Sequence, residues 1–197
     1  MKKTITLCFI LFAFLAKAQD TLHLKFFIEG YYIGGGMMRT SDTATVELHN
    51  NTSPFAVAAS FKGLFLTNGT MACNYSAVVS GHLYYIGVRT RNALVTWSAL
   101  PVAFNTITNY DFTTSANQAY GGCMDSLAPG VWAFTSGDIN QDQNIDLIDF
   151  PALDFGRCHG LCGYYPADLN GDGNIDIIDY AILDQKICLG TFGSCNP

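Results

Sequence analysis

The sequence predicts a mainly β protein, in which an N-terminal β-sandwich is followed by a small α-helical domain. Two observations carry this prediction. Short runs of alternating apolar and polar residues recur over the first two thirds of the chain, as in strands that are buried on one face. The last third repeats one aspartate-rich pattern twice, and apolar residues at helical spacing follow each copy.

The predicted sandwich covers residues 19–136, a length sufficient for one hydrophobic core. Apolar residues alternate with polar ones in its first two strands, at Leu22, Leu24 and Ile28 and then at Ala44, Val46 and Leu48. Turn residues separate the further strand candidates, which are Phe55–Phe65, Gly69–Ala77, His82–Arg91, Ala93–Trp97, Asn109–Thr113 and Val131–Thr135. Short strands at this spacing predict a sandwich, because the connections are too short for crossover helices.

The two aspartate-rich segments, residues 138–149 and 168–179, have oxygen-bearing side chains at positions 1, 3, 5, 9 and 12. Position 7 has a backbone carbonyl to offer. Six to eight oxygens in loose geometry suit calcium better than magnesium or zinc. We therefore predict two bound calcium ions, and the predicted ligands are Asp138, Asn140, Asp142, Asn144, Asp146 and Asp149 in loop 1 and Asp168, Asn170, Asp172, Asn174, Asp176 and Asp179 in loop 2.

The alternative interpretation is that clustered Asp and Asn mark ordinary polar turns. Repetition of the whole ladder, with Ile at position 8 of both copies, argues against it. The two loops differ at position 6, where the chain turns sharply: loop 2 has Gly173 and loop 1 has Gln143. A side chain in the left-handed conformation costs about 1–2 kcal/mol, so we expect loop 1 to be the weaker site.

The segments around the loops distinguish them from a complete EF-hand, which has a helix on each side. A strand-like run precedes loop 1, and Pro166 disfavours a helix before loop 2. Each loop has an exiting helix, predicted at Ile148–Phe155 and at Ile178–Ile187. The repeats are thus EF-hand-like, with only the second helix of each hand.

A duplicated calcium loop with an exiting helix and Asp at position 12 resembles the type I dockerin repeat of secreted bacterial proteins, here over residues 137–197. The resemblance implies that calcium folds this domain and that its helices dock onto a cohesin-like partner. Loop positions 10 and 11 would make that contact, and these are Leu147, Ile148, Ile177 and Ile178. They are more apolar than is usual in the family, so packing against the upstream domain or against each other is an alternative. Residues 81–92 resemble a β-module that recurs before such repeats.

The first 18 residues predict a secretory signal peptide. A basic start, an apolar stretch from Ile5 to Ala16 and a small-x-small site at Ala16-Lys-Ala18 are its three parts. The apolar stretch is too short to span a membrane, so we expect no membrane insertion. The expected location is secreted, either extracellular or at the cell surface.

The charge of the chain excludes nucleic acid as a partner. Removal of the signal peptide takes away three of the 10 basic residues and leaves 7 against 16 acidic ones, a formal charge of −9. Most of these acids lie in the last third, where they would repel one another without a cation. Metal binding and folding of this region are therefore expected to be linked.

Six cysteines remain after processing, and an even number outside the cell predicts disulfides. We expect one pair inside the sandwich and a covalent clasp around the repeats; the residues are Cys73 and Cys123, then Cys158, Cys162, Cys188 and Cys195. The sequence does not determine their connectivity. A zinc site made of Cys158, His159, Cys162 and Cys188 is the alternative.

No arrangement of a nucleophile with a base is recognisable, so we predict that the protein is not an enzyme. The only glutamates, Glu29 and Glu47, are expected on outward faces, which disfavours a glycosidase pair. A carbohydrate-binding module is a further alternative. Flat rings for stacking on a polysaccharide are available at Tyr84, Tyr85, Trp97, Tyr110 and Trp132.

Together these observations predict a secreted, calcium-binding, non-enzymatic protein of attachment or assembly. Its favoured partner is a cohesin-like protein. The first alternative is a self-assembling structural subunit, in which copies of the chain form a calcium-stabilised surface layer or filament. The second alternative is the carbohydrate-binding module.

Overall fold

The computed structural model describes residues 19–76, 79–189 and 196–197. The predicted signal peptide and Cys195 lie outside these residues. Within them the protein is mainly β, as predicted, with two α-helices near the C-terminal end. No helix among the described residues is both long and apolar enough to cross a membrane.

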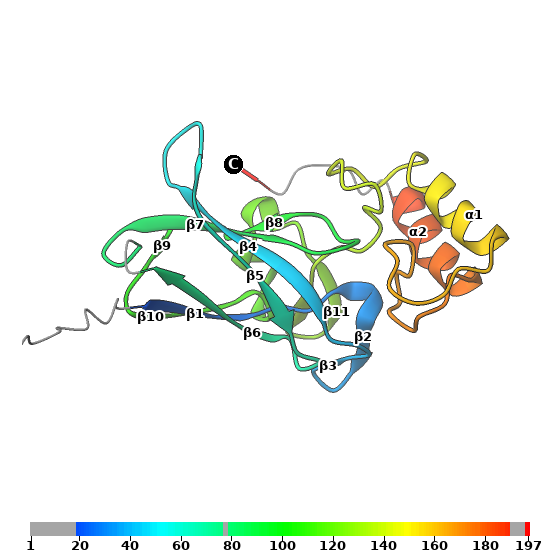
Figure 1. Ribbon diagram of the computed structural model, residues 1–197, viewed down its shortest axis with the longest axis horizontal. Helices are drawn as coiled ribbons and strands as arrows, with labels where there is room; N and C mark the ends of the chain where they lie inside the picture. Colours follow the sequence, from blue (N-terminus) through cyan, green and yellow to red (C-terminus); the bar gives the residue numbers. More distant parts are fainter. Residues whose placement is uncertain (1–18, 77–78, 190–195) are drawn as a thin grey trace, which may run out of the picture.

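Two sheets face each other to form the sandwich (Figure 1). One has the order β10-β1-β6 and contains β1 (Gln19–Lys25), β6 (Thr70–Ser76) and β10 (Ile107–Asp111). The strand β1 runs parallel to β10 and antiparallel to β6. The other sheet has the order β5-β4-β7-β8, with β9 also paired to β7; its strands are β4 (Asp42–Asn50), β5 (Val57–Phe65), β7 (Leu83–Arg89), β8 (Thr96–Trp97) and β9 (Val102–Ala103).

The predicted alternation accounts for the sandwich core. Every second side chain of a strand points to the same face, and Leu22 and Leu24 of β1 are buried together with Val46 and Leu48 of β4. Aromatic rings fill the centre, where Phe26 stacks on Phe134 with ring centroids 5.0 Å apart. The longer predicted strands therefore lie close to where the sequence pattern placed them, whereas the predicted strand Ala93–Trp97 is reduced to Thr96–Trp97.

Several short elements complete the sandwich. The strand β12 (Val131–Ala133) lies within the predicted range Val131–Thr135, and it pairs with β11 (Asp125–Ala128), which was not predicted. The other elements that were not predicted are β9, the hairpin of β2 (Tyr32–Gly34) with β3 (Met37–Met38), and the 3-10 turns η1 (Glu29–Tyr31), η2 (Phe112–Thr114), η3 (Ala116–Gln118) and η4 (Tyr120–Gly122). Elements of two to four residues are too short to show a clear periodicity.

The helices α1 (Phe150–Cys158) and α2 (Ile177–Leu189) lie at one end of the sandwich (Figure 1). Each begins within two residues of its predicted start, and Pro151 occupies the first turn, where its missing N–H costs nothing. A small apolar cluster joins the loops to the helices; its buried members are Leu94, Ile139, Ile145, Leu153, Ala167, Leu169, Ile175 and Leu183. Leu94 belongs to the sandwich, so this apolar cluster includes residues on both sides of residue 136. The predicted domain boundary at residue 136 stays a prediction.

The predicted disulfides are corrected by the structure. Cys73 is a free thiol inside the sandwich core, so the expected Cys73–Cys123 pair does not form. Its neighbours on β6 alternate inward and outward, which makes Cys73 a small apolar core residue. Cys158, Cys162 and Cys188 are free and exposed, so the described part of the predicted clasp is not closed either.

Burial predicts that Cys73 is chemically inert in the folded protein. Desolvation raises the pKa of its thiol to about 12, so the reactive thiolate is nearly absent at pH 8. We expect iodoacetamide at pH 8 to modify Cys158 and Cys188 within minutes and Cys73 only after unfolding in denaturant, as read by peptide mass spectrometry. Labelling of Cys73 at the rate of Cys158 in the native protein would contradict this placement.

Candidate functional site: the two aspartate-rich loops

The aspartates at position 12 close both loops in the same way. In loop 1, Asp149 accepts hydrogen bonds from the backbone N–H groups of Ile139, Asn140 and Asp146, at 2.8, 3.1 and 3.0 Å. In loop 2, Asp179 accepts from Leu169, Asn170 and Asp176, at 2.8, 3.1 and 2.8 Å. Both carboxylates are fully buried. The duplicated sequence pattern therefore corresponds to a duplicated hydrogen-bond network.

The aspartates at position 1 differ in how well they are satisfied. In loop 2, both carboxylate oxygens of Asp168 accept backbone hydrogen bonds, from Gly171 and Asp172 and from Gly173. In loop 1, Oδ2 of Asp138 accepts from Gln143 at 3.2 Å, but Oδ1 is buried without a hydrogen-bond partner. A buried anionic oxygen without a donor is costly, and a cation would satisfy it.

The pKa values of the loop carboxylates also indicate that their negative charge is disfavoured. Burial, followed by the nearby charge of Asp149, raises the pKa of Asp138 to about 6. Burial also raises the pKa of Asp149, Asp168 and Asp179. The position-1 and position-12 carboxylates are thus placed where a negative charge is disfavoured unless a cation neutralises it.

The remaining predicted ligands form short side-chain turns that shape the loops. Asn140 accepts from the N–H of Asp142, which in turn accepts from Asn144, and Asp146 accepts from Ile148. The same three contacts recur in loop 2 at Asn170, Asp172 and Asp176. No group of three or more His, Cys, Asp or Glu side chains is arranged to hold a metal ion within the described ranges. The alternative zinc site at Cys158, His159, Cys162 and Cys188 is accordingly not formed.

Backbone conformation separates the two loops, as the sequence predicted. Gln141 and Gln143 of loop 1 have φ values of 62° and 71°, in the left-handed region. The equivalent positions of loop 2 are Gly171 and Gly173, which reach φ values of 71° and 85° without a Cβ clash. Loop 1 thus carries strain at two residues that loop 2 does not.

The four apolar residues at positions 10 and 11 face solvent. Leu147 and Ile148 are 69% and 64% exposed, and Ile177 and Ile178 are 73% and 51% exposed. They do not pack against the sandwich, which was the alternative left open by the sequence. These four exposed side chains, which stand at equivalent places of the two repeats, are called the apolar quartet below.

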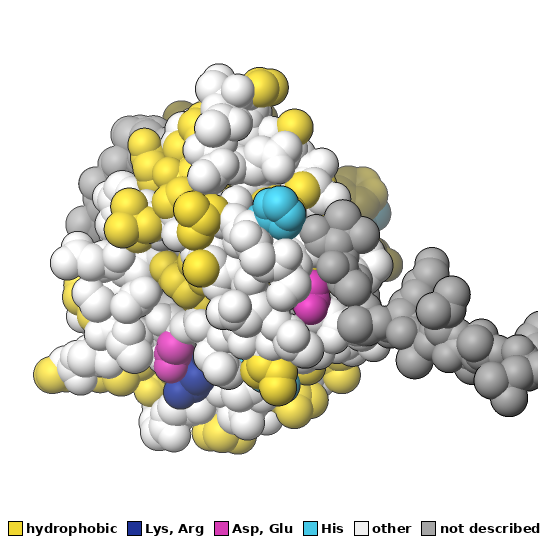
Figure 2. Space-filling view, turned by 90° about the vertical axis from the view of Figure 1, so that its left-hand side faces the viewer, with side chains coloured by type: hydrophobic (Ala, Val, Ile, Leu, Met, Phe, Trp, Pro, Cys, Tyr) yellow, Lys and Arg dark blue, Asp and Glu magenta, His cyan; other side chains and the backbone are white. Residues whose placement is uncertain are grey.

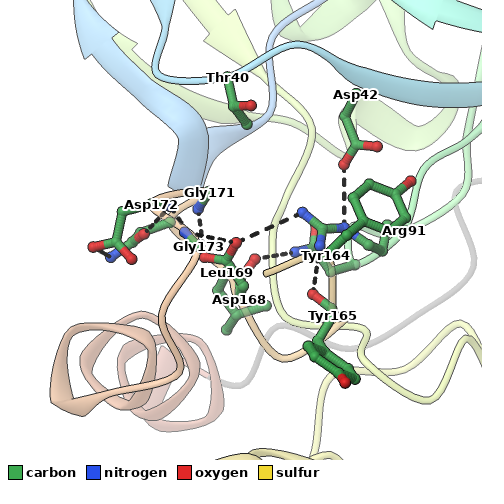
Figure 3. Close-up of polar contacts among 12 residues, drawn as sticks. Thr40, Asp42, Arg91, Tyr164, Tyr165, Asp168, Leu169, Gly171, Asp172 and Gly173 are labelled. Carbon is green, nitrogen blue, oxygen red and sulfur yellow. Dashed lines mark hydrogen bonds and ion pairs between the residues drawn. The ribbon is translucent and has the colours of Figure 1, made fainter. Parts of the chain in front are cut away.

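Loop 2 meets the sandwich at Arg91, a residue that the sequence interpretation did not single out. Its side chain is 8% exposed and lies between two carboxylates: Nε is 3.1 Å from Asp42 Oδ2, and an Nη is 3.9 Å from Asp168 Oδ2 (Figure 3). The guanidinium also donates to the carbonyl of Tyr165 at 2.6 Å and lies over the Tyr164 ring. A hollow of about 290 Å³ adjoins it, between Thr40 and Asp42 on one side and Asp168 and Gly173 on the other. An isolated Arg gives no periodic signal, so only the fold reveals this contact.

A second buried cation anchors helix α2. Lys186 is 2% exposed, and its Nζ lies 2.7 Å from Glu29 Oε1 and 2.9 Å from Asp125 Oδ1. The expectation that Glu29 faces outward is therefore wrong, since it is turned toward the helix. Glu47 lies 3.2 Å from the ring of His49 and is not paired with Glu29. The two glutamates therefore have different partners, Lys186 for Glu29 and His49 for Glu47.

The rings considered for carbohydrate stacking are largely inside the fold. Tyr84 and Trp97 are 8% and 7% exposed, and the indole of Trp97 packs against His49 with centroids 3.8 Å apart. Tyr85, Tyr110 and Trp132 are partly buried. Trp97 is therefore a packing residue and does not form a stacking surface.

Comparison with solved structures shows a fold likeness. The matching crystal structures include an N-terminal and a C-terminal interface mutant of a type II cohesin-X-dockerin complex from Acetivibrio cellulolyticus. In each case the identity is 16%, and the match covers 85% of this chain and 95% of the other, with TM-scores of 0.53 for the C-terminal mutant and 0.52 for the N-terminal one. At this identity the likeness concerns the fold. Neither protein-family models nor curated protein sequences give a match.

These comparisons correct the family resemblance. The sequence pattern suggested type I dockerin repeats behind a β-module, but no dockerin model matches the chain. The structural neighbours are type II complexes of a cohesin with an X-dockerin, and at 16% identity the likeness shows a shared fold alone. The loop spacing misled the interpretation because a ladder of oxygen ligands reports local chemistry and leaves the family open.

The buried Lys186 predicts a loss of stability when its charge is removed. Lys186→Met leaves Glu29 and Asp125 facing each other, and we expect the free energy of unfolding to fall by about 2–3 kcal/mol in urea denaturation. This is below the value for a fully buried pair, since the two carboxylates keep 18% and 27% of their exposure. Adding Glu29→Gln to the variant is expected to recover part of the loss. A change below about 0.5 kcal/mol would contradict the contact.

Proposed function

We propose that the protein is a non-enzymatic docking module whose two C-terminal loops bind calcium. The observation that carries the calcium proposal is the buried, unpartnered Oδ1 of Asp138, in a loop whose hydrogen-bond network is repeated at Asp168 to Asp179. Position-1 and position-12 aspartates would hold the ions together with side chains and carbonyls at the positions between. Calcium there would supply positive charge, which the acidic C-terminal third of the chain needs in order to fold.

The docking surface that we propose is the apolar quartet. Its four side chains come directly before or at the beginning of α1 and α2, so ordering of the loops also fixes the quartet. Exposed apolar side chains at repeated positions favour contact with another protein. Hydrophobic side chains also reach the surface at the opposite end of the molecule, where Figure 2 shows several of them close together and few charged groups.

The partner that we propose is a dockerin-type protein module. The matching solved structures are complexes of a cohesin with an X-dockerin, which supports a partner of the dockerin type. The cohesin-like partner suggested by the sequence is therefore replaced by its counterpart. An extracellular location agrees with this function and with the predicted signal peptide. Self-association of the chain through the same quartet is the second candidate, favoured by its exposed, purely apolar composition.

Calcium titration tests the metal proposal. We expect calorimetry on residues 19–197 to show two sites of unequal affinity, and chelator to reduce the helical circular dichroism. Gln143→Gly removes left-handed strain at loop 1 and is expected to tighten the weaker site by roughly fivefold, the equivalent of about 1 kcal/mol. The matched control Gly173→Gln weakens the stronger site. Absence of calcium-dependent heat would overturn the metal proposal.

Capture on an immobilised chain tests the docking proposal. Purified dockerin-type modules, cohesin modules and the chain itself are offered in calcium and in chelator, and we expect calcium-dependent retention of a dockerin-type module. Leu147→Asp with Ile177→Asp places two charges in the contact and is expected to weaken retention at least tenfold. Leu100→Asp is the control, since Leu100 of the sandwich is 73% exposed, as Ile177 is. Retention of a cohesin or of the chain alone would contradict the proposed partner.

A further inference from the structure

The two loops are attached to the sandwich unequally. Loop 2 and α2 contribute both of the buried ion clusters already described, through Asp168 and Lys186. Loop 1 contacts the sandwich beside Asn92 and Ala93, where Gly137 donates to the Asn92 carbonyl at 2.8 Å and Gln141 Nε2 lies 3.5 Å from the Ala93 carbonyl. The charged contacts are thus concentrated on loop 2.

The backbone of loop 2 also packs directly against the sandwich. The side-chain amide of Asn92, fully buried, donates to the carbonyl of Asp168 at 2.8 Å. A Cβ on Gly30 would lie 2.1 Å from the carbonyl oxygen of Leu169, so this approach is open only to glycine. On the loop side, Gly171 lies against Thr40 and Tyr31. Positions 1 to 4 of loop 2 are therefore fixed by sandwich residues.

Arg91 connects the sandwich to Asp168, the carboxylate at position 1 of loop 2. Its planar guanidinium has enough donors to bind both sides at once, with Asp42 and Tyr31 in the sandwich and Asp168 and the Tyr165 carbonyl in the repeat (Figure 3). Asp168 is a predicted calcium ligand of loop 2. Arg91 therefore contacts a residue that would also bind the ion. Loop 1 has Asp138 at this position, buried and with an unpartnered oxygen.

We propose that Arg91 is a positioning residue that couples calcium at loop 2 to the stability of the sandwich, while loop 1 orders independently of it. The inference rests on the proposed calcium binding. A ligand that binds only the folded state stabilises whatever unfolds together with its site. Because loop 2 shares buried contacts with the sandwich, calcium there stabilises both parts, and calcium at loop 1 stabilises chiefly the repeats.

The chain contains its own reporter for this coupling. Its two tryptophans, Trp97 in β8 and Trp132 in β12, both lie in the sandwich, so their fluorescence follows sandwich unfolding. The experiment compares the thermal shift that calcium produces in tryptophan fluorescence for the full chain and its variants, with calcium binding measured by calorimetry in parallel. Asp138→Asn and Asp168→Asn form a matched pair, since each removes one charge at position 1 of its loop.

We expect Asp168→Asn to abolish most of the calcium-induced shift and Asp138→Asn to retain most of it. Arg91→Met is expected to bind calcium at both loops and yet to lose at least half of the shift. If Arg91→Met does not fold, Arg91→Lys replaces it in the experiment. The lysine ammonium keeps the positive charge beside Asp42 but cannot also reach Asp168 and the Tyr165 carbonyl. The Arg91→Lys variant is expected to lose part of the calcium-induced shift.

Two outcomes would overturn the inference without affecting the proposed calcium binding. One is an equal loss of the calcium-induced thermal shift in the Asp138→Asn and Asp168→Asn variants. The other is a full thermal shift in whichever Arg91 variant folds. Absence of calcium heat in the unmodified chain would instead overturn the proposed calcium binding and this inference with it. Calorimetry thus separates the two failures.

Discussion

The burial of negative charge at one end of the sandwich is the constraint on which the rest of this structure depends. Four aspartates, at positions 1 and 12 of the two loops, are nearly inaccessible to solvent. A buried carboxylate needs donors or a cation. The position-12 residues obtain three backbone N–H groups each, and this requirement bends each loop into the same shape. The loops in turn decide where α1 and α2 begin and which apolar residues face solvent.

The position-1 aspartates solve the same problem in two ways. Asp168 receives backbone donors on both oxygens and has Arg91 of the sandwich nearby. Asp138 keeps one oxygen without a partner. The difference makes the two loops structurally unequal: loop 2 shares buried polar contacts with the sandwich, and loop 1 has an amide contact to it at Gln141. The glycines at Gly171 and Gly173 and the strained Gln141 and Gln143 follow the same division.

A docking role places particular demands on such an end. The apolar quartet has to stay exposed without collapsing into the small cluster beneath it, in which Ile145 and Ile175 are buried. Rigid attachment through Arg91 and Lys186 would keep the quartet oriented relative to the sandwich, since Arg91 of the sandwich contacts loop 2 and Lys186 of α2 contacts the sandwich. The same attachment is expected to make loop 2 and α2 unfold together with the sandwich.

The sequence by itself determined the longer strands, the two aspartate-rich loops and the two helices, because each has a periodicity or spacing set by local backbone geometry. Alternation at Leu22 and Leu24 and at Val46 and Leu48 follows from the two-residue repeat of a strand, and the ligand ladder follows from the geometry of one loop. Tertiary structure alone decided the rest. Cys73 is buried without a disulfide, Glu29 meets Lys186 across 157 positions of sequence, and Arg91 meets Asp168. These contacts join residues far apart in the chain, so neither spacing nor composition indicates them.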